Sequence, residues 1–206
     1  MMEHPVTQGS EAWHILRLGK PTASEFGNLV TPEGKVRSGE MPETYLYEKL
    51  AESVTGKPLE EGQSWAMGQG AMLESEAIPF FTLAFDIPVR RMGFITTDDM
   101  KIGASPDGLI GTDGGLEVKC PLPQTHLKYL LRGTLPPQYV AQIQGSMWVT
   151  GRPYWYFMSY NRALPPLVLK VERDAEFQES LTLALKAFLA KMDAANAKLS
   201  SLRATA

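Results

Sequence analysis

Apolar side chains recur at helical spacing along several segments of this 206-residue chain. The longest such segment is 175–199, where about one large apolar residue per turn predicts a closing amphipathic helix. The residues of this stripe are Phe177, Leu181, Leu185, Phe188 and Met192. Apolar periodicity, together with start and stop signals, predicts further helices earlier in the chain. They cover residues 10–18, 22–29, 42–54, 64–85, 124–131 and 137–149.

Short alternating apolar runs bounded by turn residues predict strands among these helices. The expected strands cover residues 89–96, 101–104, 108–110, 116–120, 153–160 and 167–171. Helices before and after a central β region predict an α/β fold, in which a central mixed β-sheet is flanked by helices. No repeat or low-complexity tract interrupts the chain, so we expect a single domain over residues 1–206.

Two acidic residues and a lysine gather on one expected hairpin. Residues 105–109 read SPDGL, and a strand at 116–120, which reads LEVKC, follows the turn-forming sequence GTDGG. Side chains alternate along a strand, so Glu117 and Lys119 share one face while Val118 packs on the other. The acid and the amine therefore face the same site.

The register of this hairpin sets the distance between the two carboxylates. With the turn centred near Asp113, Asp107 lies opposite Lys119. Glu117 is then one diagonal step from Asp107, which places the carboxylates about 5–8 Å apart. Leu109 falls on the same face, which is unfavourable beside a polar site. We therefore expect a bulge or twist at the preceding glycine to turn Leu109 away.

A site of this composition predicts metal-assisted cleavage of a phosphodiester, and hence a nuclease. Mg²⁺ and Mn²⁺ prefer oxygen ligands and are commonly held by one or two carboxylates, here Asp107 and Glu117. The ion would acidify an attacking water, while Lys119 would orient or deprotonate that water and offset phosphate charge. An acid-x-lysine pair alone is commonly a surface ion pair, so the hypothesis depends on the turn, the apolar strand and their spacing together.

A second polar set occurs near the start of the chain. Residues 22–25 read TASE, a capping box that predicts a helix with free amide groups and a positive dipole end. An anionic phosphate suits that end, where Ser24 lies and where Arg17 can donate two hydrogen bonds. Both residues also have simpler interpretations, Ser24 as a helix-start residue and Arg17 as a surface charge.

The net charge of −3 and the pI of about 5.7 constrain any nucleic-acid surface. Proteins that bind phosphates over a broad surface are usually basic. Basic residues must therefore be concentrated here, and a narrow positive channel in an acidic body can still focus its field on DNA. The candidates are Lys20, Lys35, Arg37, Arg90, Arg91, Lys128 and Arg132.

Cysteine and histidine usage narrows the possible classes of protein. The single cysteine, Cys120, permits no internal disulfide and fits a small core residue in a reducing compartment. The three histidines lack metal-ligand spacing, which argues against a zinc site.

No apolar run approaches the length of a bilayer span, and residues 1–5 lack the features of a signal peptide. We expect a cytoplasmic protein without membrane contact.

The motifs above belong to a longer series of separated blocks. The blocks are 12–14 (AWH), 17–19 (RLG), 22–25 (TASE), 70–74 (GAMLE), 105–109 (SPDGL), 116–121 (LEVKCP), Tyr139, 141–142 (AQ), 146–150 (SMWVT), 155–157 (WYF) and 171–174 (VERD). In this order they resemble the PD-(D/E)xK nuclease superfamily and, more closely, the lambda-exonuclease family of phage recombination nucleases. The resemblance implies a restriction-endonuclease-like core and a processive, Mg²⁺-dependent 5′→3′ exonuclease. It would degrade one strand of linear double-stranded DNA from its 5′ end and leave 3′ single-stranded tails for recombination by strand annealing.

The resemblance also implies roles for individual residues. The catalytic residues would be Asp107, Glu117, Lys119 and Gln142. The ligands of two ions, Mg²⁺ with Mn²⁺ able to substitute, would be Asp107, Glu117, the Val118 carbonyl and the helix-borne Glu74. The residues around the terminal 5′-phosphate would be Arg17, Ser24 and Ser105. Gln144 lies two residues from Gln142 on the same expected helix, so at most one of the two should reach the site.

Partners follow from the same resemblance. Members of the family form a ring-shaped homotrimer that encircles duplex DNA, and enclosure could supply processivity without tight surface binding. Double-stranded DNA ends would be the substrate, and a single-strand annealing protein would be the recombination partner.

Other interpretations fit parts of the sequence. Another PD-(D/E)xK nuclease, such as an endonuclease or a repair nuclease, would carry the same motifs. A DNA-end-binding protein could keep the fold without cleavage, although the complete set of Asp107, Glu117 and Lys119 argues against this. A calcium-binding loop would need an aspartate-rich alternating pattern that is missing here. An iron–sulfur nuclease is excluded because one cysteine cannot hold a cluster.

Overall fold

The computed structural model describes residues 1–59 and 65–204, with the backbone alone for 65–72 and 204. In chain order its elements are β1 (Met2–His4), α1 (Glu11–Arg17), the 3₁₀ helix η1 (Ala23–Asn28), α2 (Glu40–Thr55), α3 (Trp65–Phe85), β2 (Phe94–Thr96), β3 (Gly103–Ala104), β4 (Gly108–Ile110), β5 (Gly114–Lys119), α4 (Pro123–Arg132), α5 (Pro137–Thr150), β6 (Tyr154–Asn161), β7 (Leu164–Glu172) and α6 (Ala175–Ala204). The predicted start of α3, residue 64, lies outside the described residues. The predicted α/β fold, a mixed sheet flanked by helices, is confirmed.

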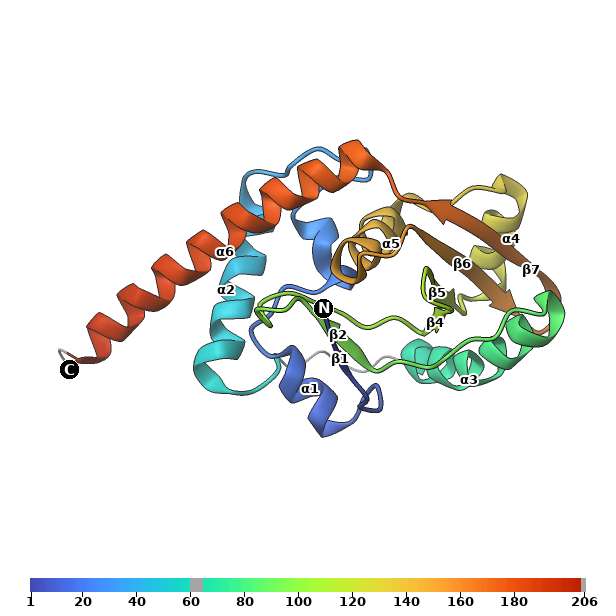
Figure 1. The fold of residues 1–206 in the computed structure, drawn as a ribbon, viewed down its shortest axis with the longest axis horizontal. Helices are drawn as coiled ribbons and strands as arrows, with labels where there is room; N and C mark the ends of the chain where they lie inside the picture. Colours follow the sequence, from blue (N-terminus) through green and yellow to red (C-terminus); the bar gives the residue numbers. More distant parts are fainter. Residues whose placement is uncertain (60–64, 205–206) are drawn as a thin grey trace.

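A four-stranded sheet in the order β4-β5-β6-β7 lies between helices (Figure 1). β5 and β6 are parallel, whereas the other two pairs are antiparallel. Side-chain alternation divides β6 between two faces: Trp155 and Phe157 pack with α4 and α5, and Met158 packs with α3. β7 begins before its predicted start and includes Pro165 and Pro166. An edge strand tolerates these prolines because its outer N–H groups need no partner strand.

A separate antiparallel sheet, in the order β1-β2-β3, includes one strand that was not expected and shortens another that was. β1 does not follow from the sequence pattern, because three residues are too few to show a periodicity. The strand predicted over 89–96 shortens to β2, and Arg90 forms only an isolated bridge with Leu109. α5 contacts both β2 and β3 of this sheet and β6 of the other, so this helix joins the two sheets.

The segment predicted as an α-helix over 22–29 is the 3₁₀ helix η1, and the predicted capping box does not form. Thr22 occupies the N-cap position, but its side chain makes no bond to the backbone amides and instead contacts other side chains. Phe26 packs η1 against α5, where a Cβ at Gly145 would come within 2.4 Å of the Phe26 ring. A six-residue 3₁₀ helix offers no strong dipole, so that argument for phosphate binding is wrong.

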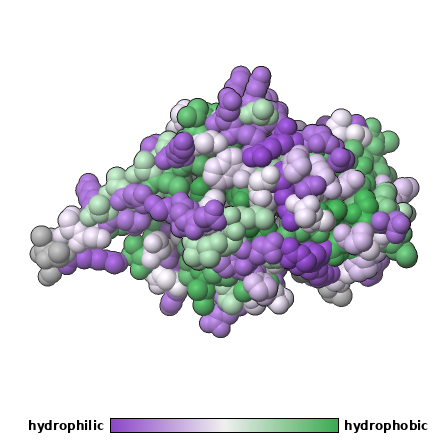
Figure 2. Space-filling model, in the orientation of Figure 1, coloured by the Kyte–Doolittle hydropathy of each residue, from purple (hydrophilic) through white to green (hydrophobic). Residues whose placement is uncertain are grey.

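α6 extends past its predicted end at residue 199 to Ala204. All five residues of its apolar stripe are buried, which confirms the predicted amphipathic helix. The helix projects from the body, and its far end carries the C-terminus (Figure 1). Hydrophilic residues are spread widely over the face shown in Figure 2. Within the described part of the chain, no helix combines the length and apolar character needed to cross a bilayer.

Candidate active site

The β4–β5 hairpin brings the two predicted acidic residues face to face. Pairing is centred on Thr112, one residue earlier than predicted, so continuing the ladder by one step sets Asp107 opposite Glu117. The prediction that Asp107 faces Lys119 is therefore wrong. Directly opposed residues have Cβ atoms about 4.5–5.5 Å apart, closer than a diagonal pair. The Val118 amide donates to Asp107 Oδ2 at 2.6 Å and fixes the carboxylate in this position.

The bulge expected beside Leu109 does not occur in the described hairpin, whose three strand pairs are regular. Leu109 stays on the same face as Asp107 and is 1% exposed, in the core cluster that contains Ile143 and Met147 of α5. The face is unfavourable for leucine only if solvent reaches it. Because α5 covers it, the polar site lies at the end of a buried apolar face.

Glu117 has one carboxylate oxygen with partners and one without. Gln142 of α5 donates from Nε2 to Oε1 at 2.5 Å, and Lys119 Nζ lies 2.7 Å from the same oxygen. Glu117 is 2% exposed, and its Oε2 accepts no hydrogen bond from any described residue. The other two buried side-chain atoms without a partner in the described part of the chain, in Arg152 and Trp155, are N–H donors. A buried acceptor without a donor is costly, and a cation would satisfy it.

The charges around Asp107 indicate the same need. Burial and the carboxylates of Glu117 and Glu74 raise the pKa of Asp107 well above its usual range, against the opposing charge of Lys119. Burial also raises the pKa of Glu74, which lies on α3. Negative charge is therefore in excess, and a divalent cation would neutralise it. Among the described residues, no three acidic, histidine or cysteine side chains form a metal-binding group. Mg²⁺ is commonly held by one or two carboxylates together with waters and substrate phosphate.

Val118 presents a further oxygen to this side of the hairpin. The N–H and C=O of one strand residue point to the same neighbouring strand. Since the Val118 amide points to Asp107, its carbonyl faces that side too, beyond the last pair of β4 and β5. The Val118 side chain is buried on the opposite face, as predicted. Asp107, Glu117 and this carbonyl fit the oxygen-rich ligand set of Mg²⁺ or Mn²⁺.

Lys119 is held as a cation beside the carboxylates. Burial lowers its pKa, but the charges of Glu117 and Asp107 outweigh burial and raise the pKa overall. The ring centroid of Tyr139, on α5, lies 5.4 Å from Nζ and adds a cation–π contact. A dication bound to the same carboxylates would lower the pKa of Lys119 again.

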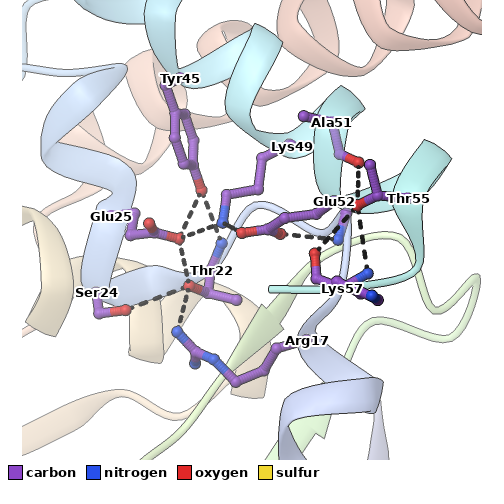
Figure 3. A network of polar contacts seen from close by, with 11 residues as sticks. Arg17, Thr22, Ser24, Glu25, Tyr45, Lys49, Ala51, Glu52, Thr55 and Lys57 are labelled. Atoms are coloured by element: carbon purple, nitrogen blue, oxygen red, sulfur yellow. Dashed lines mark hydrogen bonds and ion pairs between the residues drawn. The ribbon is translucent and has the colours of Figure 1, made fainter. Parts of the chain in front are cut away.

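A second polar cluster joins the three residues predicted to surround a 5′-phosphate. Arg17 donates from Nη1 to Ser105 Oγ at 3.0 Å and from Nη2 to Thr22 Oγ1 at 3.2 Å. Ser24 Oγ lies 3.2 Å from the same Thr22 oxygen (Figure 3). The Arg17 guanidinium lies over the ring of Trp13, with 4.3 Å between Cζ and the ring centroid. The structure therefore brings Arg17, Ser24 and Ser105 together.

The proton of the Ser105 hydroxyl is available to an outside acceptor. Trp13 Nε1 and Arg17 Nη1 both donate to Ser105 Oγ at 3.0 Å, and neither group can accept. They use the two lone pairs of the oxygen, which leaves its single proton without an acceptor among the described residues. Such a set of donors suits an anion. Because Ser105 lies two residues before Asp107, a bound anion would adjoin the acidic cluster.

The expectation that at most one of Gln142 and Gln144 reaches the site is confirmed. Gln144 bonds to backbone atoms of Glu172 and Asp174, so of the two glutamines only Gln142 reaches the site. Cys120, which was expected in the core, is only half-buried against the apolar residues around α3, and burial raises the pKa of its thiol to about 12. A thiol that stays protonated at neutral pH is a packing residue rather than a reactive one.

The sequence motifs assign no task to Trp13 or Tyr139, although both contact functional groups. Trp13 lies four residues before Arg17, and Tyr139 lies three residues before Gln142. Residues at these spacings share a helix face, and this is the signal that could have found them. Thr22 gives no such signal, because its sequence context indicates a helix cap.

Comparison with known proteins agrees with this geometry. Residues 12–153 match the model of the YqaJ-like viral recombinase domain family. LHK-Exo, an alkaline exonuclease from Laribacter hongkongensis with a crystal structure in complex with dAMP, is 31% identical, with a TM-score of 0.85 over 95% of this chain and 99% of that chain. A phage-related exonuclease from Haemophilus somnus 129PT is 15% identical, with a TM-score of 0.67 over 87% of this chain and 96% of that chain. At this identity the likeness shows a shared fold alone. The uncharacterised protein ExoD of Escherichia coli (strain K12) is 33% identical over 78 residues, 35% of this chain and 90% of ExoD.

The family match spans more than half of the chain and includes both polar clusters, from Arg17 to Gln142. The likeness to LHK-Exo extends over nearly all of the remainder. The chain belongs to the YqaJ-like viral recombinase domain family, and thus to the lambda-exonuclease family of phage recombination nucleases.

Proposed function

We propose that this protein is a processive, Mg²⁺-dependent 5′→3′ exonuclease of the cytoplasm. It degrades one strand of linear double-stranded DNA from the 5′ end and leaves 3′ single-stranded tails, which serve recombination by strand annealing. Family membership and the likeness to LHK-Exo support a recombination exonuclease. The metal dependence and the direction rest on the two polar clusters. Residues 1–206 would act together as one nuclease domain.

The arrangement at Glu117 carries this proposal. Gln142 and Lys119 orient Glu117 through Oε1, so Oε2 remains a buried acceptor on the hairpin face that Asp107 shares. Bound Mg²⁺, or Mn²⁺ in its place, would supply Lewis acidity toward water and the scissile phosphate. Asp107, Glu117 and the Val118 carbonyl would hold it, with Glu74 as the acid of a second ion position.

The surrounding side chains have separate tasks. Lys119 holds a positive charge at Nζ, with which it orients the attacking water and offsets charge on the phosphate. Gln142 keeps the Glu117 carboxylate in one orientation. α5 covers the inner side of the site and excludes water there, which strengthens each of these electrostatic interactions.

The proposed direction rests on the cluster around Arg17. A terminal phosphate carries more charge than an internal one and would accept hydrogen bonds from Arg17 and Ser105, and from Ser24 once its hydroxyl turns from Thr22 to the phosphate. Because Ser105 lies two residues before Asp107, a phosphate bound there holds the neighbouring phosphodiester near the acidic cluster. A 5′-hydroxyl end offers this cluster no comparable anion.

The proposal also includes a homotrimer that encircles the DNA and a single-strand annealing protein as partner. Some of the candidate basic residues are engaged within the chain itself. Arg90 donates two hydrogen bonds to Glu3, and Arg37 donates to the carbonyls of Gly27 and Val30. A ring would hold DNA by enclosure, which suits a chain whose net charge is −3.

A comparison of DNA topologies tests the function. With Mg²⁺, the protein should consume a linearised plasmid from each 5′ end and leave the same plasmid intact as a closed circle. Gel electrophoresis of the circle and release of label from 5′-labelled linear DNA measure the two outcomes. EDTA should stop all release, and Mn²⁺ should restore it. Cutting of the circle would favour an endonuclease, and intact linear DNA would favour an end-binding protein without cleavage.

Arg17→Ala should lower the preference for phosphorylated over hydroxyl 5′ ends by about tenfold, the order of one charge-assisted hydrogen bond. The measurement is the ratio of kcat/KM for two duplexes that differ only in the 5′ group. Arg162→Ala is the matched control, because this exposed arginine pairs with Glu76 outside the cluster. An unchanged ratio in Arg17→Ala would remove Arg17 from the pocket.

A further inference from the structure

A network of side chains from η1 and α2 supports the Arg17 cluster and has no part in the chemistry proposed above (Figure 3). Its centre is Glu25, whose Oε2 accepts from Thr22 Oγ1 at 3.1 Å and from Tyr45 Oη at 3.2 Å. Lys49 Nζ lies 3.2 Å from the same oxygen. The Lys49 side chain is only 8% exposed and also pairs with Glu52 Oε1 at 3.0 Å.

The hydrogen bonds of Thr22 have only one consistent direction. Arg17 can only donate and the Glu25 carboxylate can only accept, so the single Thr22 proton goes to Glu25. Both lone pairs of Thr22 Oγ1 then receive donors, one from Arg17 and one from Ser24. Glu25 therefore fixes the rotation of the Thr22 hydroxyl, and through it the position of Arg17 Nη2.

Tyr45 gives this network a rigid base. It is 1% exposed, and its ring stacks on Phe188 of α6 with centroids 5.1 Å apart. Its Oη accepts from the Thr22 amide at 3.2 Å and donates to Glu25. Burial and the charge of Glu25 raise the pKa of Tyr45 well above its usual range, so the phenol remains a donor. Thr22 and Glu25 are thus both tied to α2.

Lys49 makes a carboxylate tolerable at this place. A negative charge one hydroxyl away from Arg17 would repel an incoming phosphate, or would attract the guanidinium away from it. Lys49 offsets the negative charge of Glu25, and Glu25 still accepts hydrogen bonds from Thr22 and Tyr45. A buried ion pair costs free energy to desolvate and is no general source of stability. Stability alone therefore does not explain the pair of Lys49 and Glu25, whereas positioning of the Arg17 cluster does.

We propose that Glu25 and Lys49 are positioning residues for the 5′-phosphate pocket: Glu25 orients Arg17 through Thr22, and Lys49 offsets the charge of Glu25. The pair thereby sets how strongly the enzyme discriminates phosphorylated from hydroxyl 5′ ends. This inference rests on the proposed function, since it concerns the pocket assigned there to the terminal phosphate.

Lys49→Met tests the proposal in the full chain. The ratio of kcat/KM for 5′-phosphate over 5′-hydroxyl duplexes should fall by about fivefold, while turnover of the hydroxyl duplex stays within about twofold of the parent. The ratio is taken within one preparation, so any loss of active protein cancels. Lys101→Met is the matched control, because Lys101 forms an exposed pair with Asp193 at 3.1 Å, and its ratio should not change.

The double variant Glu25→Gln with Lys49→Met separates positioning from simple packing. It removes the charge at Glu25, the carboxylate bonded to Thr22, and keeps a side-chain oxygen as acceptor for Thr22. Glu52, which also loses Lys49, keeps the Gly19 amide as a donor, so the ratio should return to within about twofold of the parent. The proposal would be overturned if the double variant had the same low ratio as Lys49→Met. It would also be overturned if, in the single variants, kcat/KM fell equally for the 5′-phosphate and the 5′-hydroxyl duplexes. If Lys49→Met does not fold, Glu25→Gln and the double variant still give the ratio.

The possible failures have different signatures. A parent protein that leaves linear DNA intact contradicts the proposed function. A parent that digests DNA with a ratio unaffected by Arg17→Ala contradicts the pocket. A ratio that falls in Arg17→Ala and stays at the parental value in Lys49→Met overturns the positioning role alone.

Discussion

Lys119→Met should lower the rate of nucleotide release from linear duplex DNA by about a thousandfold, the scale of a group that acts on charge and proton position in the transition state. Methionine keeps much of the aliphatic stem and removes the ammonium group that lies 2.7 Å from Glu117 Oε1. Affinity for DNA ends should change by about threefold at most, because binding is distributed over many phosphate contacts. Release of label from 5′-labelled duplex, and fluorescence anisotropy with Ca²⁺ in place of Mg²⁺, measure the two quantities.

The chain contains a matched control for this variant. Lys170 lies on β7, two residues from Glu172, with 3.1 Å between Nζ and Oε1. Its Nζ also lies 4.4 Å from the ring centroid of Tyr154, as Lys119 lies over Tyr139. Lys170→Met therefore removes the same kind of strand pair and ring contact at an exposed place, and nuclease activity should persist. Equal losses in both variants would show that a general change of charge, rather than the acidic site, controls the rate.

The acidic site is predictable because its information is local. Asp107, Glu117 and Lys119 lie within thirteen residues, on two strands joined by a short turn, and alternation alone decides which side chains share a face. Gln142 depends on helical spacing and on the resemblance to a family, and the structure brings it to Glu117. The register is the part that fails, because several residues of the turn tolerate positive φ and the sequence does not select one centre.

The support of the phosphate pocket is not local, and the sequence pattern does not reveal it. Glu25 and Lys49 lie 24 positions apart, and their contact depends on how α2 packs against η1. The TASE motif predicts a capping box, but the packing of Phe26 against Gly145 selects a 3₁₀ helix. Thr22 is then free to serve the Arg17 cluster. Local capping preference, worth about 1 kcal/mol, is thus overridden by tertiary contacts.

Asp107→Asn should abolish metal-dependent digestion and, without metal, should make the protein more stable than the parent. Burial and the charge of Glu117 raise the pKa of Asp107, so its ionised form is disfavoured in the folded state. Asparagine removes the charge and keeps an oxygen to accept from the Val118 amide. A gain of about 1 kcal/mol would raise the melting temperature by about 2–4 °C for a chain of this size.

The pH dependence of this difference has a definite sign. A carboxyl whose folded pKa is raised contributes stability that is fully present below its unfolded pKa of about 3.9 and is lost as pH rises through the folded value. The parent should therefore weaken relative to Asp107→Asn as pH rises from about 4 toward neutrality. Differential scanning calorimetry in EDTA across this range measures the effect. Saturating Mg²⁺ should then stabilise the parent more than the variant, because binding to the folded state requires the carboxylate.

Asp99→Asn provides a control of opposite sign. The Asp99 carboxylate accepts hydrogen bonds from the Thr97 hydroxyl and the Lys101 amide, and these bonds hold its pKa below the usual value. Its ionised form is favoured in the folded state, so Asp99→Asn should leave the melting temperature unchanged or lower it at neutral pH. If Asp107→Asn is less stable than the parent in EDTA, or if Mg²⁺ stabilises both proteins equally, Asp107 is not a metal ligand held against electrostatic repulsion. Stabilisation of the parent alone by Mg²⁺ would instead place the ion at this carboxylate independently of any measurement of activity.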